Sequence, residues 1–157
     1  MLKRIGKAGR TGRTGGHFAI VASKYNARYV GGMVKAAEKC LRAAGVESVR
    51  ILRVPGAFEI PVVAAKLAHS HLPSLSAIIC LGVILRGKTT HAQHIGEAVS
   101  QALAQIQIQT GVPIIHEVLL LESKAQAEAR CLSPGHNRGA EAAHTALEMK
   151  RVMQSLG

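Results

Sequence analysis

The sequence predicts an α/β protein with three layers, in which helices cover both faces of a four-stranded parallel sheet. Short apolar runs alternate with longer stretches whose apolar residues recur at helical spacing, a pattern typical of repeated strand and helix units. The clearest run, residues 77–85 (AIICLGVIL), contains nine residues without a charge, as a strand covered on both faces does. Right-handed crossovers between such strands favour the order 2-1-3-4, which is the flavodoxin-like topology.

Four strands are predicted from the apolar runs. They cover residues 17–22, 48–54, 77–85 and 114–121. Turn residues bound them, since Pro55 and Gly56 follow the second strand and Pro73 precedes the third. His116 and Glu117 interrupt the fourth strand, and polar groups in a buried strand need partners. A histidine with satisfied hydrogen bonds is the simpler interpretation of His116, and a functional histidine is the alternative.

The first two helices are predicted from apolar spacing and from residues that end helices. The first begins at Arg28, places five apolar residues on one face and ends at Gly45. These five residues are Val30, Met33, Val34, Ala37 and Leu41. The second helix runs from Glu59 to about His71, and its first turn tolerates Pro61.

A third helix follows His91 and repeats the spacing of the first. Its predicted apolar face consists of Ile95, Ala98, Val99, Ala102 and Ile106. Gly111 and Pro113 end this helix before the fourth strand. Two further helices, at about 123–132 and 140–155, complete the chain.

Length and composition indicate one cytoplasmic domain at 17–157 preceded by a short arm. The 157 residues suit a single domain, and a hydrophobic content of 48% excludes disorder of most of the chain. The longest apolar run is too short to span a bilayer, and the N-terminus lacks the apolar core of a signal peptide. Residues 1–16 contain five glycines and predict a flexible arm. The three cysteines, Cys40, Cys80 and Cys131, are expected to be free thiols.

The predicted arm is strongly basic. The chain has a formal net charge of +11, and five of its cations fall in the first 13 residues without one acid. Such an arm could hold nucleic acid by counterion release, but a solvated tail is the simpler interpretation. An aromatic content of 3% leaves few side chains on which bases could stack, so nucleic acid is not an expected partner.

The turn after residues 77–85 has the composition of a phosphate site. Residues 86–91 (RGKTTH) provide two cations, a glycine, two hydroxyls and a histidine directly before a helix, whose first N–H groups favour an anion. Ligands of open parallel sheets bind beyond the carboxyl ends of the strands. His91 can in addition move protons near neutral pH. The chemistry of the protein is therefore expected at this turn.

The same stretch also matches a nucleotide-binding pattern, G-x-x-x-x-G-K-[ST], from Gly82 to Thr89. In that interpretation Lys88 would contact terminal phosphates and Thr89 would bind magnesium. A true phosphate loop must begin at its first glycine, whereas here the strand pattern continues for three residues beyond Gly82. Glu122 is a weak substitute for the second magnesium ligand. An NTPase is therefore the less favoured alternative.

Further polar residues are predicted at or near the same edge of the sheet. Tyr25 and Asn26 follow the first strand. Glu59 and the N–H groups of the turn before it could bind a polyol or a polar ring, or could form an ordinary helix cap. Arg130 and Arg138 flank the last linker, and either could chelate a phosphate or carboxylate or remain solvated.

Three stretches together resemble the lumazine synthase family. They are 54–61 (VPGAFEIP), 82–91 (GVILRGKTTH) and 137–143 (NRGAEAA). The resemblance runs from about Phe18 to Met153 and explains the nucleotide-pattern match, since the family's phosphate turn begins at Arg86. It implies an enzyme of riboflavin biosynthesis that condenses 5-amino-6-(D-ribitylamino)uracil with 3,4-dihydroxy-2-butanone 4-phosphate. The product would be 6,7-dimethyl-8-ribityllumazine, with release of phosphate and water.

The resemblance also implies roles for individual residues. His91 would be the general acid and base, Tyr25 would stack on the pyrimidine ring, and Asn26 would support the loop that carries Tyr25. The other implied substrate contacts are Ala57, Glu59, Arg138 and Glu141 around the ribityl chain, Val83, Ile84 and His116 around the ring, and Gly87, Lys88, Thr89, Thr90 and Arg130 around the phosphate. Phe58 is a further implied substrate contact. Arg130 would come from the neighbouring subunit.

Three residues depart from the family pattern. Tyr25 replaces the more usual Phe or Trp and adds a hydroxyl that needs a partner. His116 stands where many members carry Phe, so this wall of the pocket could form hydrogen bonds. Lys88 stands where small or acidic residues are common, and it could strengthen phosphate binding or point into solvent.

The resemblance further implies a symmetric assembly. The family builds its site between adjacent subunits of a homo-pentamer, some members assemble twelve pentamers into a 60-subunit shell, and riboflavin synthase is a candidate partner. No metal, nucleotide or redox cofactor is implied, and the His91 and His94 pair lacks a third metal ligand. A shell protein without enzyme activity is the rival interpretation, but such a protein would not need Glu59, His91 and Arg130 together.

Overall fold

The computed structural model describes residues 13–157. The first 12 residues, with four of the five cations of the predicted basic arm, lie outside the described residues. Residues 13–16 lie beside residues 44–45. The Thr14 N–H donates to the Ala44 carbonyl (2.8 Å), and the Gly15 N–H donates to the Gly45 carbonyl (3.1 Å).

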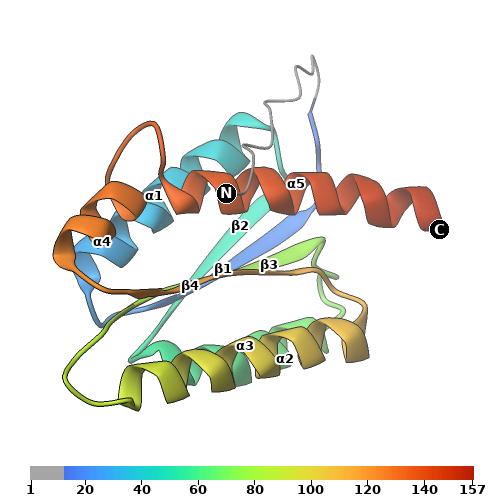
Figure 1. Cartoon of the computed structure of the whole chain (residues 1–157). Helices are drawn as coiled ribbons and strands as arrows, with labels where there is room; N and C mark the ends of the chain where they lie inside the picture. Colours follow the sequence, from blue (N-terminus) through green and yellow to red (C-terminus); the bar gives the residue numbers. More distant parts are fainter. Residues whose placement is uncertain (1–12) are drawn as a thin grey trace.

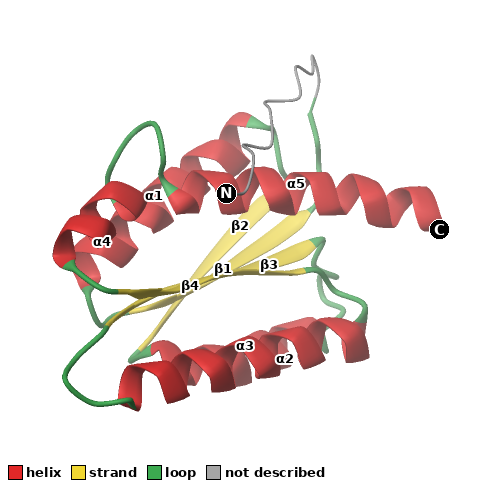
Figure 2. Cartoon of the chain, in the orientation of Figure 1, coloured by secondary structure: helices red, strands yellow, loops and turns green. Residues whose placement is uncertain are grey.

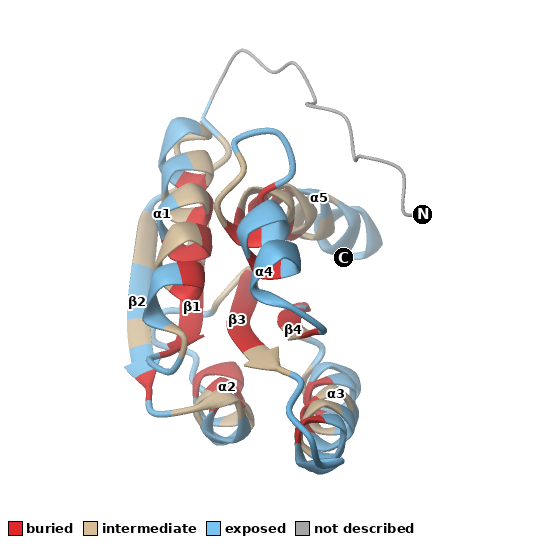
Figure 3. Cartoon of the chain, turned by 60° about the vertical axis from the view of Figure 1, so that its left-hand side comes forward, coloured by how far each residue is buried: buried red, intermediate tan, exposed pale blue. Residues whose placement is uncertain are grey.

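Four parallel strands form one sheet in the order β2-β1-β3-β4, as the sequence predicts (Figure 1). Their bounds are β1 His17–Ser23, β2 Ser48–Val54, β3 Ala77–Leu85 and β4 Ile114–Leu121. The central strands β1 and β3 are buried along most of their length (Figure 3). β2 and β4 form the two edges, and each leaves part of its length exposed.

Helices cover both faces of the sheet, which confirms the predicted three layers (Figure 2). The helical elements of the described residues are α1 Ala27–Ala43, the short 3₁₀ turn η1 Ala57–Glu59, α2 Ile60–Ala68, α3 His91–Thr110, α4 Lys124–Cys131 and α5 Arg138–Leu156. α1, α4 and α5 lie on one face, and α2 and α3 lie on the other (Figure 1). None of the helices within residues 13–157 is long and apolar enough to cross a membrane.

Each face of the sheet has its own hydrophobic core. Phe18, Ile20 and Leu81 contribute to the core under α1, α4 and α5. Val21 and Ile78 contribute to the core under α2 and α3. This division follows from strand geometry, because successive side chains of a strand point to opposite faces.

The buried face of α3 agrees with the predicted one except at its alanines. Ala98 is exposed and Ala102 is half-buried, whereas Val99, Leu103 and Ile106 are buried. α3 packs against α2 and the edge strand β4, so only the side of the helix between these two neighbours is covered. Alanine spacing alone did not indicate which side that is.

Two predicted helix boundaries also differ by a few residues. The segment from Glu59 to His71 begins as the 3₁₀ turn η1 and ends earlier, at Ala68. The last helix begins at Arg138, two residues before its predicted start, because Asn137 acts as its N-cap.

α1 and α5 approach closely at Gly139. A Cβ atom at this position would collide with the Met33 backbone carbonyl of α1. Buried alanines of α5, Ala142, Ala143 and Ala146, continue the same face. Small side chains therefore allow α5 to pack directly against α1 and to bring Arg138 close to the sheet.

None of the three cysteines forms a disulfide within residues 13–157, which agrees with the prediction. Cys80 and Cys131 are buried, and Cys40 is partly exposed. Burial raises the pKa of the Cys80 thiol to about 12 and the pKa of the Cys131 thiol to about 11. Both buried thiols therefore stay protonated and act as apolar core groups.

Candidate functional site

Three loops meet at one edge of the sheet, because they follow the neighbouring strands β2, β1 and β3. They contain residues 57–59, 25–26 and 86–91. The first two loops are joined by backbone hydrogen bonds, since the Tyr25 N–H donates to the Pro55 carbonyl (3.1 Å). Tyr25 and Phe58 are 74% and 63% exposed. Two aromatic side chains thus stand uncovered where a ligand of such a sheet is expected.

Asn26 connects these loops to β3. Its Nδ2 donates to the Val83 carbonyl (2.7 Å), so the loop after β1 is fixed against the end of β3. Asn26 has φ 58°, a left-handed conformation that Asn adopts more easily than most residues. The next residue begins α1. The bond therefore holds the loop that carries Tyr25 against the end of β3, where Ile84 is half-buried.

Residues 86–90 form an open turn before α3. Gly87 through Thr90 are all exposed, and a Cβ on Gly87 would have no atom within 4 Å. Thr90, at the N-cap, makes no side-chain hydrogen bond to the α3 backbone, and the first turn of α3 has no acidic residue. The Thr90 hydroxyl lies 3.2 Å from His94 Nε2 instead. The free N–H groups at the start of α3 are therefore open to an anion.

His91 is the first residue of α3 and is exposed beside this turn. Its backbone N–H donates to Thr89 Oγ1 over a long 3.4 Å. Within the described residues its imidazole forms no hydrogen bond, so both ring nitrogens remain available. A histidine in this position can exchange protons with a ligand that is held at the helix N-terminus.

The structure argues against the nucleotide-binding interpretation. β3 continues through Val83, Ile84 and Leu85, so no phosphate loop begins at Gly82. Glu122 accepts a hydrogen bond from Arg86 Nη1 (2.9 Å), which occupies the carboxylate proposed as a magnesium ligand. No group of three or more His, Cys, Asp or Glu side chains that could hold a metal occurs within residues 13–157.

Glu59 caps its own loop. Its Oε2 accepts a hydrogen bond from the Gly56 N–H (3.1 Å). Of the two functions that the sequence allows, a helix cap and a ligand contact, the structure therefore shows the cap. Its Oε1 forms no hydrogen bond within the described residues. Glu59 can therefore cap η1 and still accept a hydrogen bond from a hydroxyl group of a ligand. Ala57, at the start of the same 3₁₀ turn, is half-buried.

His116 lies on β4 and faces α3. Its Nδ1 accepts the Val118 N–H (3.0 Å), and its Nε2 lies 2.7 Å from Ser100 Oγ. Because Nδ1 is an acceptor, the neutral ring carries its proton on Nε2 and donates it to Ser100. Burial lowers the pKa of His116, which favours this neutral form. The hydroxyl proton of Ser100 is then free to be donated elsewhere.

Glu117, on the opposite face of β4, forms a bidentate ion pair with Arg138. The Arg138 Nε and Nη2 groups donate to its two carboxylate oxygens at 3.1 and 2.8 Å. Arg138 Nη1 also donates to Glu141 Oε2 (2.6 Å). The Glu117 and Arg138 side chains are only 11% and 20% exposed. Burial raises the pKa of Glu117, and the Glu141 carboxylate raises it further, while the positive charges of Arg138 and, more weakly, Arg130 oppose both.

The two candidate arginines therefore differ in charge compensation. Arg138 shares its one positive charge with two carboxylates. Arg130 on α4 is exposed and has no hydrogen bond or ion pair within residues 13–157. Arg130 is thus the better candidate for a phosphate, and Arg138 is better suited to an uncharged group.

The predicted site residues fall into two groups at different places on the sheet. The loop group follows β2, β1 and β3 and contains residues 25–26, 57–59 and 83–91. The edge group consists of His116, Arg130, Arg138 and Glu141, on β4 and the helices after it. Two strands separate β2 from β4, a distance of roughly 14 Å at about 4.8 Å per strand. One chain therefore does not gather Ala57 to Glu59 and the edge group around one small ligand.

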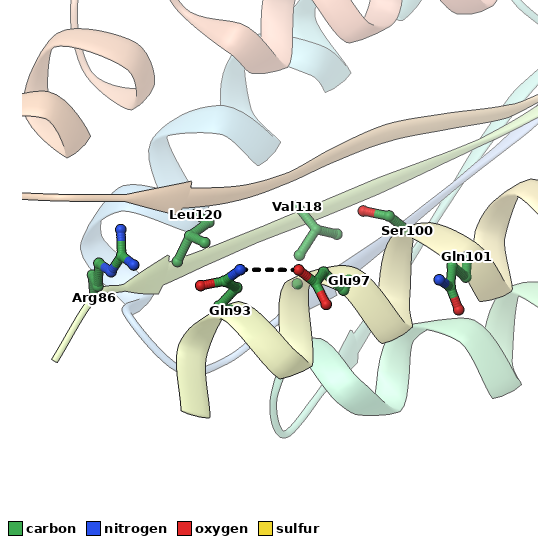
Figure 4. A pocket seen from close by; sticks show the side chains of 8 residues that line it. Arg86, Gln93, Glu97, Ser100, Gln101, Val118 and Leu120 are labelled. Carbon is green, nitrogen blue, oxygen red and sulfur yellow. Dashed lines mark hydrogen bonds between the residues drawn. The ribbon is translucent and has the colours of Figure 1, made fainter. Parts of the chain in front are cut away.

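An open groove lies between α3 and β4, on the side of β4 that carries His116 of the edge group. Its volume is about 640 Å³, and polar side chains from α3, including Gln93, Glu97 and Ser100, line it together with Val118 and Leu120 of β4 (Figure 4). Gln93 Nε2 donates to Glu97 Oε1 (3.1 Å) across its floor. The groove lies next to the Ser100 and His116 pair, on the edge of the sheet opposite β2.

Two residues that shape the site were not singled out from the sequence. Ser100 gave no signal, because its partner His116 lies on another element. Asn137 was visible only as part of a motif. Its Oδ1 accepts the N–H groups of Gly139 and Ala140, and its Nδ2 donates to the carbonyls of Gly32 and Cys131. Asn137 thereby fixes the start of α5, and with it Arg138.

Fold and site together define a class of α/β protein with an anion-binding turn, a titratable histidine and exposed aromatic side chains at the carboxyl edge of its sheet. The family model for 6,7-dimethyl-8-ribityllumazine synthase matches residues 15–154. The chain belongs to this family. Membership assigns it 6,7-dimethyl-8-ribityllumazine synthase activity in riboflavin biosynthesis.

Individual relatives agree with the family match. A 6,7-dimethyl-8-ribityllumazine synthase of Xanthomonas oryzae pv. oryzae (strain PXO99A) is 40% identical over 141 residues, which cover 88% of this chain and 90% of the relative. Proteins of the same name from Xanthomonas euvesicatoria pv. vesicatoria (strain 85-10) and Stenotrophomonas maltophilia (strain R551-3) are each 39% identical, over 145 and 141 residues. They cover 91% and 88% of this chain, and the matches cover 93% and 90% of those relatives.

Proposed function

We propose that this chain forms 6,7-dimethyl-8-ribityllumazine at a site shared by two copies. The substrates are 5-amino-6-(D-ribitylamino)uracil and 3,4-dihydroxy-2-butanone 4-phosphate. The observation that carries the proposal is the open turn at 86–90 before α3, with His91 beside it. It offers an anion site and a proton carrier within one turn of helix.

The phosphate of the ketone substrate would bind at this turn. The hydroxyls of Thr89 and Thr90 and the free N–H groups of α3 supply donors, and the exposed Lys88 adds a positive charge. Arg130 of an adjacent copy would complete the phosphate site, since its guanidinium is exposed and has no hydrogen bond or ion pair within residues 13–157.

The pyrimidine substrate would lie between the loop group of one copy and the edge group of the next. Tyr25 would stack on its ring, the main chain at Val83 and Ile84 would contact the ring edge, and His116 of the adjacent copy would close the other side. The ribityl hydroxyls would reach Glu59 of one copy and Arg138 of the other. The free Oε1 of Glu59 and the spare Arg138 donors suit an uncharged polyol.

The reaction needs repeated proton transfers, which His91 would perform. The primary amine attacks the ketone to give an imine and water, and loss of a proton from the neighbouring carbon allows phosphate to leave. The resulting enol tautomerises to a carbonyl at the former hydroxyl carbon, and the second amine attacks this carbonyl to close the ring with loss of a second water. Each step adds or removes a proton at nitrogen, oxygen or carbon. A histidine with two unoccupied ring nitrogens can act as acid in one step and as base in the next.

A closed ring of identical copies explains why the site residues are divided. Head-to-tail contacts repeat one heterologous interface around the ring, so each loop group meets a neighbouring edge group. The resemblance makes five copies the expected number. The groove between α3 and β4 lies on the side of β4 that carries His116 of the edge group, where this proposal places the neighbouring copy.

The test is lumazine formation from the two purified substrates, followed by absorbance, for the wild type and for Arg130→Ala. We expect turnover without added metal or nucleotide. Loss of a charge-assisted phosphate contact should lower kcat/KM for the ketone at least about tenfold, because such a bond contributes roughly 1.5–3 kcal/mol. A folded wild-type oligomer without turnover at saturating substrate would instead favour a shell protein without enzyme activity.

A further inference from the structure

Glu117 is a buried carboxylate that the proposed reaction does not use. It lies on β4 and is 9% exposed, and both of its carboxylate oxygens accept hydrogen bonds from the guanidinium of Arg138. A charged side chain is rarely buried unless it is paired with a group of opposite charge. The ion pair joins the edge strand to the first residue of α5.

The hydrogen-bond geometry leaves Arg138 only part of its donors. A guanidinium has five N–H donors, and Glu117 takes two of them while Glu141 takes one. Two donors therefore remain for a ligand. Because the bidentate pair uses the Nε edge, the plane of the guanidinium is fixed by Glu117, which lies on a strand, and is held further by Glu141 on the next helical turn.

The charges of the cluster matter as much as its shape. Two carboxylates surround one guanidinium, so the cluster has a net charge of minus one when all three groups are ionised. Such a cluster repels a phosphate, although an isolated arginine would attract it. It can still donate two hydrogen bonds to uncharged hydroxyls. Arg130 lies near enough to Glu117 to lower the pKa of that carboxyl, but it has no hydrogen bond or ion pair within residues 13–157 and provides the contrasting cation.

We propose that Glu117 is a positioning and specificity residue, which orients Arg138 for the polyol chain of the pyrimidine substrate and prevents this end of the site from binding phosphate. The proposal rests on the function proposed above. It assigns the two ends of the site different ligand chemistry, with phosphate at the 86–90 turn and Arg130, and the polyol at Arg138. Glu117 thereby keeps the phosphorylated substrate out of the polyol end.

The first test compares Glu117→Gln with the wild type in steady-state kinetics. We expect KM for the ribitylamino substrate to rise about tenfold, kcat to stay within about threefold, and KM for the phosphorylated ketone to stay within about twofold. Inorganic phosphate should also compete with the ribitylamino substrate several-fold more strongly. Glu117→Asp, which keeps the charge but reaches less far, should restore the exclusion of phosphate and only part of the affinity.

Glu38→Gln is the matched control, since it removes a carboxylate from the Glu38 and Arg42 ion pair on the surface of α1. Equal KM values in Glu117→Gln and the wild type would overturn the proposal, as would an equal rise of both KM values with a fall in kcat. If Glu117→Gln does not fold, Glu117→Asp alone tests the proposal. KM for the ribitylamino substrate should then rise while KM for the phosphorylated ketone stays unchanged.

Calorimetric titration of the ribitylamino substrate without the ketone separates this proposal from the reaction. A wild type that binds this substrate but does not turn over contradicts the proposed function. Weaker binding to Glu117→Gln would then still support the role of Glu117, and unchanged binding would exclude it.

Discussion

At the scale of single residues, Glu117 shows how one buried group connects stability to pH. Burial raises the pKa of this carboxyl above its ordinary value of 4.5, so the folded protein binds the proton more tightly than the unfolded chain does. Its ionised form therefore costs stability at neutral pH. That cost disappears as the pH falls through the folded-state pKa toward 4.5.

The raised pKa of Glu117 gives a measurable prediction about stability and pH. Glu117→Gln cannot titrate, so the free energy of unfolding of the wild type, relative to this variant, should rise between pH 7 and pH 5. His116 acts in the opposite direction, because its pKa is lowered, but it is present in both proteins and cancels in the comparison. Urea unfolding at the two pH values measures the difference. A relative loss of wild-type stability at pH 5 would show that Arg138 lowers the pKa of Glu117 overall.

The same scale shows what sequence patterns could not predict. Arg138 was a candidate ligand for phosphate or carboxylate, because nothing in the sequence indicates that Glu117 lies against it. The two residues are 21 positions apart on different elements. Ser100 and His116 are similarly unrelated in sequence. Residue types indicated the chemistry of the site, but contacts between elements determine which charges remain free.

At the scale of elements, the close contact of α1 and α5 positions Arg138. Gly139 allows this contact, since any Cβ there meets the Met33 carbonyl of α1. Backbone atoms cannot move aside as a flexible side chain can. The start of α5 is therefore held by packing as well as by the Asn137 cap.

We expect Gly139→Ala to destabilise the protein by about 2–4 kcal/mol, because overpacking against backbone forces the helices apart. Gly31→Ala, also in a helix, is the matched control. A Cβ on Gly31 has no atom within 4 Å, so this change should stabilise by about 0.5–1 kcal/mol through its higher helix propensity. Thermal or urea unfolding of both variants measures the contrast. Similar effects of the two changes would mean that α1 and α5 are not in close contact.

Most elements could be predicted from the sequence, because each has a strong local signal. Apolar runs gave the four strands and their order, and helical spacing predicted α1 and its buried face. The predicted face of α3 was right at Val99 and Ile106 and wrong at Ala98, since an alanine fits either a buried or an exposed side. The cap at Asn137 and the 3₁₀ turn at 57–59 shifted helix ends by amounts that apolar spacing does not resolve.

At the scale of the whole molecule, side chains cover part of the β4 edge of the sheet. Three N–H groups of β4 and the residue after it are occupied by side chains, since Ile114, Val118 and Glu122 donate to Gln107, His116 and Gln126. Side-chain acceptors in these positions oppose the addition of another strand. A neighbour at this edge therefore meets side chains and helices, which suits the proposed contact through His116, Arg130 and Arg138.

The central claim is that one site uses the loop group of one copy and the edge group of the next. The most direct measurement mixes two variants, His91→Ala and Arg130→Ala, by joint refolding or co-expression. Each variant alone should be nearly inactive. In a mixed ring, a site is complete when its loop group comes from the Arg130→Ala chain and its edge group from the His91→Ala chain, so roughly a quarter of the sites should recover. Lumazine formation at about that fraction of wild-type activity is the predicted result, and a mixture no more active than its components would contradict the shared site.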